Sequence, residues 1–188
     1  MAIIDDIVEA ALAEFSEVGI RRTSINDVAR RTGLGRATVY RYVGSKDRLI
    51  QLVIKAETRR LYAEFDRAVA SCEDAAEWIE TALDFVVHKI RGHPLFDRVL
   101  HREPEILLPA LTIRGGPVLA FYRSLIARQL RGMKDRGQIN PENIDGTAET
   151  LARLAISFVL TPEGVVDGDD PKAVSAFARD VLLPILGG

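Results

Sequence analysis

The sequence predicts an all-α fold of about nine helices. Apolar residues recur with the 3.6-residue spacing of amphipathic helices, and the long segments lack the two-residue alternation of strands. Prolines occur where a first helical turn begins, and glycines separate the periodic segments. The chain has 188 residues, of which 47% are hydrophobic and 28% charged, so it is long enough to bury a core and does not have the composition of a disordered protein.

The N-terminal segment is expected to form three helices joined by tight turns. Periodic apolar residues predict a helix over 3–18, and Gly19 follows as a C-cap. A short second helix begins after Ser24, because Ser24 and Asp27 have the spacing of a capping box. A glycine-containing turn separates it from a third helix over 36–43.

The rest of the chain continues the helical pattern, and several of its helices begin at prolines, which the first helical turn tolerates. The expected helices cover residues 45–70, 74–91, 94–102, 105–113, 117–136, 142–161 and 171–186. No apolar run reaches the roughly 20 residues that span a bilayer, so no membrane partner is expected.

Cysteine content and the N-terminal charge favour a reducing compartment. The single cysteine, Cys72, excludes an intramolecular disulfide and a cysteine-based metal site within one chain. The first twenty residues contain five acidic residues and no lysine or arginine, the opposite of a secretory leader. We therefore expect a soluble, cytoplasmic protein without a bound cofactor.

Positive charge is concentrated between residues 21 and 48. This window contains eight basic and two acidic residues, a balance of +6, whereas the whole chain has a formal net charge of −2. Neutralisation of phosphates by such a cluster supplies most of the non-specific affinity of DNA-binding proteins. The window also has a short helix, a glycine turn and a second helix, the order of a helix-turn-helix motif, whose second helix enters the major groove.

The second helix of this motif carries side chains suited to contact with DNA. Arg36 has the geometry to pair with guanine, and Thr38 to meet a phosphate or a thymine methyl group. The hydroxyls of Tyr40 and Tyr42 suit phosphates, while Val39 is expected to pack inward.

Many residues in and around this window recur at the spacing of a known family. They are Phe15, Gly19, Thr23, Ser24, Ile25, Asp27, Val28, Ala29, Gly33, Thr38, Val39, Tyr40, Arg41, Tyr42, Val43, Ser45, Lys46, Asp47 and Leu49. In residue type and spacing this stretch resembles the DNA-binding domain of the TetR family of bacterial transcriptional regulators. The resemblance implies a helix-turn-helix DNA-binding domain over 1–48 and a helical ligand-binding and dimerisation domain over 49–188.

The resemblance also implies DNA-contacting positions and a function. Phosphate or base contacts would come from Thr23, Ser24, Thr38, Tyr40, Tyr42 and Lys46, and positions that vary between members to read different operators would be Arg36, Ala37 and Arg41. One departure from the family pattern is Gly35 at the start of the third helix, where a side-chain N-cap is commoner. The implied function is that of a homodimeric transcriptional regulator, most often a repressor, that a small, largely apolar ligand releases from a palindromic operator.

Other interpretations stay open from the sequence. One is that the basic residues form a solvated face and the glycine turn an ordinary helical hairpin. Another is a protein that carries a ligand or binds another protein and whose DNA-binding domain is vestigial. An enzyme is not expected, because the sequence has no Ser-His-Asp set, phosphate-binding loop or dinucleotide-binding glycine motif. Activators and repressors use the same DNA contacts, so the sequence does not separate them.

Three polar residues, His93, Asp97 and His101, are spaced four apart and share one helical face. This spacing suits either a partial metal site or a polar face that lines a pocket or meets solvent. His93 precedes Pro94 and is expected at the helix cap, so no bound metal is expected.

The resemblance further implies a largely apolar ligand cavity among the central helices. Aromatic residues are spread over these helices, and most of them are expected in the core. Candidate lining residues are Trp78, Phe85, His88, Phe121 and Tyr122.

Two apolar stripes near the C-terminus, within 142–161 and 171–186, are wider than one helix face inside a monomer needs. The resemblance implies a two-fold dimer through a four-helix bundle of these segments, and the alternative is that both stripes belong to the monomer core. Candidate interface residues are Leu151, Leu154, Phe158, Val174, Phe177, Val181, Leu182 and Ile185.

Overall fold

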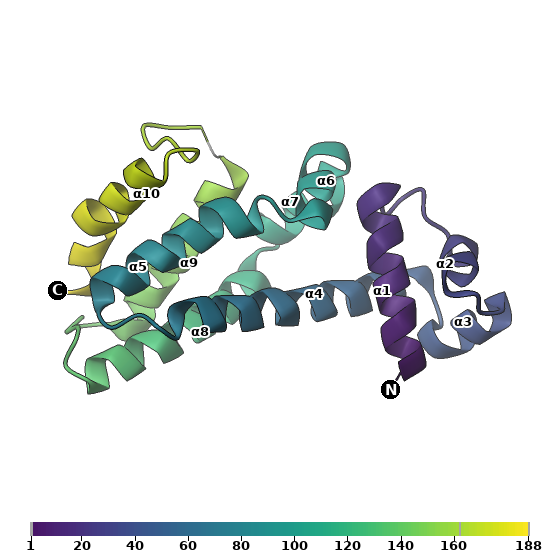
Figure 1. Cartoon of the computed structure of the whole chain (residues 1–188), viewed down its shortest axis with the longest axis horizontal. Helices are drawn as coiled ribbons and strands as arrows, with labels where there is room; N and C mark the ends of the chain where they lie inside the picture. The colour runs from purple at the N-terminus through teal and green to yellow at the C-terminus, as the bar shows by residue number, and fades with distance from the viewer. Residues whose placement is uncertain (1, 162, 188) are drawn as a thin grey trace. The chain divides into compact units, whose positions relative to one another are not determined.

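A computed structural model describes residues 2–161 and 163–187, and every regular element in these residues is helical (Figure 1). The α-helices are α1 (Ala2–Glu17), α2 (Ile25–Thr32), α3 (Arg36–Val43), α4 (Lys46–Val69), α5 (Ala75–Asp84), α6 (Pro94–Arg102), α7 (Pro104–Leu111), α8 (Gly116–Asp135), α9 (Ile144–Leu160) and α10 (Pro171–Phe177). The predicted all-α class is confirmed. Within the described residues no helix is both long enough and apolar enough to cross a membrane.

Three short segments of non-α helix extend α5 and α10. They are the π-helical segments η1 (Phe85–Ile90) and η2 (Ala178–Leu182) and the 3-10 segment η3 (Leu183–Leu186). The sequence predicted uninterrupted helices in both places. Pro184 explains the break in the second, because proline lacks an N–H and its ring clashes with the carbonyl four residues earlier.

The chain forms two compact units. Unit 1 combines the N-terminal segment up to Glu64 with residues 93–107, and unit 2 combines residues 65–92 with the segment from Leu108 onward. The polypeptide therefore passes between the units three times, and helix α4 belongs to both. The boundary expected after residue 48, between a DNA-binding and a ligand-binding domain, stays a prediction.

The core of unit 1 is formed by the apolar faces of its helices. Ile7 and Phe15 of α1 pack with Val28 of α2 and Val39 of α3, and all four are almost completely buried. Leu95 and other apolar residues of α6 join the same core, although they follow α3 by about fifty residues. Residues 93–107 thus complete the N-terminal unit.

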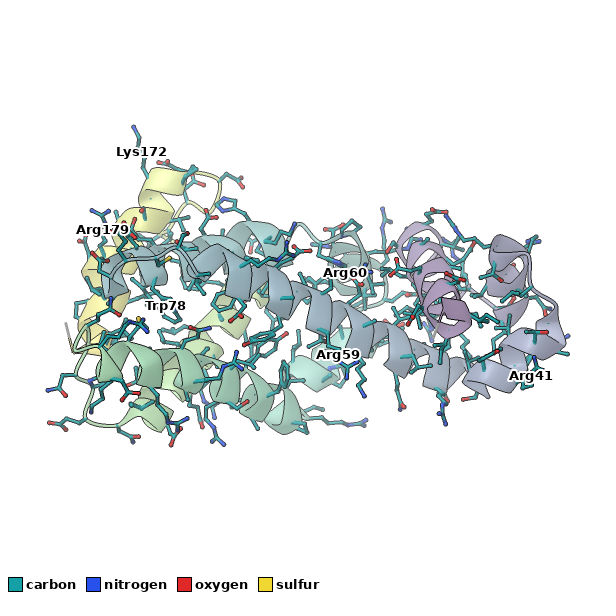
Figure 2. All side chains as sticks on the ribbon, turned by 60° about the horizontal axis from the view of Figure 1, so that its bottom comes forward. Arg41, Arg59, Arg60, Trp78, Lys172 and Arg179 are labelled. Atoms are coloured by element: carbon teal, nitrogen blue, oxygen red, sulfur yellow. The ribbon has the colours of Figure 1, made fainter. Side chains whose placement is uncertain are left out.

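The core of unit 2 lies among α5, α8, α9 and the C-terminal segment. Trp78 of α5, Leu130 of α8, Ala148 of α9 and Val174 of α10 are buried in one cluster. Figure 2 shows Trp78 pointing inward from α5. The apolar faces that the sequence periodicity predicts for these helices pack against one another within a single chain.

A buried carboxylate holds the turn between α1 and α2. Glu103, 6% exposed, accepts hydrogen bonds from the backbone N–H groups of Ile20 at 2.7 Å and Arg21 at 2.8 Å. Beside it, the guanidinium of Arg98 donates to the carbonyl of Val18 at 2.8 Å. We call this set of contacts the Glu103 clamp. It satisfies one buried and one partly buried backbone donor that would otherwise lack a partner.

Substitution of Gly19 by alanine is expected to destabilise unit 1 by about 1–2 kcal/mol, the cost of a left-handed conformation for a residue with a Cβ. Gly19 has φ +103°, and a Cβ there would lie 3.1 Å from Oε1 of Glu103. Thermal unfolding of the full chain measures the effect. Gly132→Ala is the control, because its Cβ would meet nothing closer than 3.5 Å on α8. Equal stability of the two variants would contradict the expectation.

Candidate nucleic-acid interface

Helix α2 has defined ends, which fix the turn that precedes α3. Its N-cap is Ser24, whose hydroxyl donates to Asp27 Oδ2 at 2.6 Å, and whose backbone N–H donates to the same carboxylate at 2.8 Å. The N–H of Asp27 donates back to the Ser24 hydroxyl at 3.3 Å, which confirms the predicted capping box. Gly33 ends the helix with φ +70°, a left-handed conformation that glycine adopts without strain.

The capping box is expected to make the stability of unit 1 depend on pH. Hydrogen bonds from the side chain and backbone of Ser24 lower the pKa of Asp27 below its usual value. A carboxyl group with a lowered pKa stabilises the fold above its unfolded-state pKa, and that contribution disappears as the pH falls through the folded-state value. Asp27→Asn should therefore lower the melting temperature at pH 7 and have progressively less effect toward pH 3.

The comparison for this titration is Asp47→Asn, which removes a carboxylate from the first turn of α4 and leaves the capping box intact. The melting temperatures of wild type and Asp27→Asn should converge between pH 7 and pH 3, and at pH 7 Asp47→Asn should be less destabilised than Asp27→Asn because it keeps the capping box. A constant offset for Asp27→Asn would show that the carboxylate does not act through the capping box.

Helix α3 buries one narrow stripe and exposes the rest of its surface. Val39 and Val43 are fully buried, so the predicted inward packing of Val39 is confirmed. The side chains of Arg36, Ala37, Tyr40, Arg41 and Tyr42 are exposed and that of Thr38 is half-buried. Figure 2 shows Arg41 on this helix.

The exposed arginines of α3 lie over the exposed tyrosine rings. The guanidinium of Arg36 is 5.4 Å from the ring centroid of Tyr40, and that of Arg41 is 5.6 Å from the ring centroid of Tyr42. Such cation–π contacts hold a guanidinium without neutralising its charge. The surface of α3 is therefore positively charged and carries two aromatic hydroxyls, a combination suited to phosphates and base edges.

Gly35 is the N-cap of α3 and provides no side-chain hydrogen bond, as the sequence indicated. The first N–H groups of this helix therefore lack a side-chain acceptor at the cap. Free N–H groups at a helix N-terminus favour nearby anions such as phosphates.

The candidate contact residues outside α3 are in different situations. Thr23 is 2% exposed, and its hydroxyl donates to the carbonyl of Gly19 at 2.7 Å, so this hydroxyl is engaged inside unit 1. Ser24 is exposed, but its hydroxyl is part of the capping box. Lys46 is half-buried, and its ammonium donates to the carbonyl of Arg21 at 2.9 Å.

Three of the eight basic residues in the positive window, Arg21, Arg30 and Arg31, are paired with carboxylates, Arg21 with Glu105 at 2.7 Å. Arg31 forms ion pairs with Glu14 at 3.0 Å and with Glu17 at 2.5 Å, and its hydrogen bonds lower the pKa of Glu17. Arg30 is paired with Asp27. The positive surface of the motif is consequently shifted toward α3, and the Arg31 pairs fasten α2 to α1.

The polar face of α6 brings together His101 Nδ1 and Asp97 Oδ1, at 3.1 Å, but pairs His93 with a residue of another helix. His93 is the N-cap, as expected, and its Nε2 lies 2.9 Å from Oε2 of buried Glu57 on α4. His101 Nδ1 lies 2.9 Å from the carbonyl oxygen of Asp97. In the part of the chain that the structure describes, no three histidine, cysteine, aspartate or glutamate side chains are grouped to hold a metal ion.

Unit 2 contains a small apolar cavity of about 70 Å3. Its lining comes from α5, η1, α8, α9, η2 and the end of α4, namely Phe65, Trp78, Ile79, Ala82, Leu83, Val86, Ile126, Leu151, Leu154, Ala155, Phe158 and Leu182. The indole N–H of Trp78 is buried without a hydrogen-bond partner among the described residues. The cavity therefore combines an apolar wall with one residue whose polar donor is unsatisfied.

The five candidate ligand residues do not all lie at this cavity. Trp78 lines it, whereas Phe85 is buried with its ring edge-on to Phe65. His88 is paired with Asp84 on the surface. The two remaining candidates pack edge-on against each other on α8, where Phe121 is exposed and burial raises the pKa of Tyr122.

The candidate interface residues divide into buried and accessible sets. Leu151, Val174 and Leu182 are buried within the single chain, so their contacts are those of the unit 2 core. Val181 is 46% exposed. The remaining candidates, which are half-buried, are Leu154, Phe158, Phe177 and Ile185.

A short helix, a glycine turn and an exposed, basic second helix on a packed three-helix unit define a helix-turn-helix transcriptional regulator. Residues 7–53 match the family described as bacterial regulatory proteins, tetR family, and residues 74–179 match the C-terminal domain of the bacterial tetracycline repressor. The second match alone covers more than half of the chain, which therefore belongs to the TetR family. Members are regulators rather than enzymes and bind operator DNA, typically as homodimers.

Individual relatives are distant but cover nearly the whole chain. The HTH-type transcriptional regulator UidR of Escherichia coli K12 is 23% identical over 189 residues, covering 97% of this chain and 90% of UidR. The TetR-family repressor QsdR of R. erythropolis superposes with a TM-score of 0.64 at 22% identity, over 98% of this chain and 94% of QsdR. A regulator from Cytophaga hutchinsonii superposes with a TM-score of 0.72 at 18% identity, over both complete chains. At these identities the structures show the common fold.

Proposed function

We propose that this protein is a homodimeric repressor that binds a palindromic operator through α3 and is released by a small, largely apolar ligand. The surface of α3 supports the DNA-binding part of this proposal. Arg36, Arg41 and two tyrosines are exposed there, while Val39 and Val43 hold the helix in the core of unit 1. Two such helices, related by a two-fold axis, would read half-sites about 34–36 Å apart.

The cavity of unit 2 supports the ligand part of the proposal. Its lining side chains are apolar, and a ligand acceptor atom would satisfy the buried indole N–H of Trp78. A volume of about 70 Å3 is well below the roughly 300–1,000 Å3 of typical ligand pockets, so the ligand would select a conformation with a larger cavity. Val86 of the π-helical segment η1 contributes to the wall, and π-turns are frequent at functional sites.

A second copy of the chain is proposed to cover the accessible apolar side chains near the C-terminus. Leu154, Phe158, Phe177, Val181 and Ile185 keep exposed surface in the single chain. Covering such surface is the driving force of obligate homodimers. Sedimentation of the purified protein at micromolar concentration as a monomer of 20.8 kDa would refute the dimer.

The experiment that tests the proposal is selection of bound duplexes from a random DNA library at about 100 mM salt, where non-specific binding is weak enough to wash away. We expect a palindrome to be enriched. The selected duplex then serves to screen uncharged apolar compounds for release. By linkage, a true effector must bind more weakly to the operator complex than to the free protein by the same factor by which it weakens DNA binding. Failure to enrich any sequence would favour a ligand-binding protein with a vestigial DNA-binding domain.

A further inference from the structure

Unit 1 contains a second cavity, distinct from the surface of α3. Its volume is about 440 Å3, and it lies between the end of α1, the turn before α2 and the end of α6. The residues that line it, which we call the arginine pocket, are Val18, Arg21, Arg22, Arg98, Arg102 and Glu103.

Positive charge exceeds negative charge in the arginine pocket. Four guanidinium groups line it together with one carboxylate. That carboxylate, Glu103, already accepts hydrogen bonds from two backbone N–H groups of the α1–α2 turn. Arg21 is paired with Glu105 at 2.7 Å, and within the described residues no other arginine of the pocket forms an ion pair.

The remaining guanidinium groups are held by neutral acceptors or by none. Arg22 and Arg98 both donate to the carbonyl oxygen of Val18, at 3.0 and 2.8 Å. The Nε of Arg98 is buried and has no hydrogen-bond partner among the described residues. Arg102 is exposed and, over the same residues, makes no hydrogen bond or ion pair. A carbonyl oxygen orients a guanidinium but does not neutralise it. Four guanidinium groups against the carboxylates of Glu103 and Glu105 leave a net charge of +2 around one cavity.

We propose that the arginine pocket binds a small multivalent anion that carries phosphate groups. Planar guanidinium groups form paired, charge-assisted hydrogen bonds with phosphate oxygens, and several of them converge here on one concave surface. The cavity volume falls within the range of small-molecule sites. The bound anion would bridge α6 to the turn before α2, and this site does not depend on the proposed operator or on the cavity of unit 2.

The test is calorimetric titration of the full chain with inorganic diphosphate in a chloride buffer. We expect saturable binding of one diphosphate per chain to the wild type, and binding weakened at least about tenfold by Arg102→Gln, which removes one charge-assisted contact. Because Arg102 makes no contact that the fold requires, this variant should fold. Arg114→Gln, at an exposed arginine of unit 2, is the matched control and should bind diphosphate as the wild type does.

Two results would overturn the proposal. One is the absence of saturable diphosphate binding by the wild type, and the other is equal binding by Arg102→Gln and Arg114→Gln. A DNA titration separates the two sources of phosphate: if Arg102→Gln weakens binding to a duplex while the wild type binds no diphosphate, the arginines contact the DNA backbone and the small-anion site does not exist.

Discussion

An Arg36→Ala, Tyr40→Ala double variant is expected to bind the selected operator at least about 100-fold more weakly than the wild type. A bidentate arginine–guanine contact is worth about 1–3 kcal/mol, and each 1.4 kcal/mol corresponds to a factor of ten in affinity. The two side chains form one cation–π pair on the exposed surface of α3, so their losses are coupled. Fluorescence anisotropy with the operator and with a scrambled duplex measures the change and separates specific from non-specific binding.

Arg59→Ala is the matched control for this variant. Arg59 is an exposed arginine on α4, and its loss changes the net charge by the same amount as the loss of Arg36. We expect Arg59→Ala to lower the affinity for both duplexes slightly and equally, because electrostatic attraction to the DNA phosphates does not depend on base sequence. Operator affinities that are equal in the double variant and in Arg59→Ala would exclude α3 as the recognition helix.

Glu103→Ala is expected to lower the free energy of unfolding of unit 1 by about 2–4 kcal/mol, because one buried and one partly buried backbone donor lose a charged acceptor. These donors are the N–H groups of Ile20 and Arg21, at the turn that leads into α2. Chemical denaturation, followed by circular dichroism of the full chain, measures the change.

Two further variants test the origin of this effect. Glu103→Gln keeps one carbonyl oxygen and should be intermediate in stability. Glu105→Ala removes an exposed carboxylate that is paired with Arg21, and exposed pairs contribute about 0–1 kcal/mol. If Glu103→Ala were no less stable than Glu105→Ala, the clamp would not contribute to the stability of unit 1.

Short-range sequence patterns correctly predicted the local structure of the helix-turn-helix motif. The helix over 36–43, the Ser24–Asp27 capping box and the inward packing of Val39 all depend on residues within a few positions of one another. Helix propensity, capping and apolar periodicity act over the same short distances, so a single sequence is enough to predict these features.

Contacts between distant segments were not predictable in the same way. Glu103 and Ile20 are separated by 83 positions, and no local pattern marks a glutamate after α6 as a backbone acceptor. The wide C-terminal stripes include Leu151 and Val174, which are buried inside the chain, because periodicity shows that a face is apolar but not what covers it.

The division of unit 1 into two sequence segments bears on how the protein folds during synthesis. Helices α1 to α3 leave the ribosome first, but Leu95 and Glu103 belong to their core and turn and are translated later. At about 5–20 residues per second, residues 65–107 take roughly 2–9 s to be made. During that interval the nascent recognition helix lacks part of its support. Unit 1 therefore reaches its final structure only after residues 65–107 have been translated.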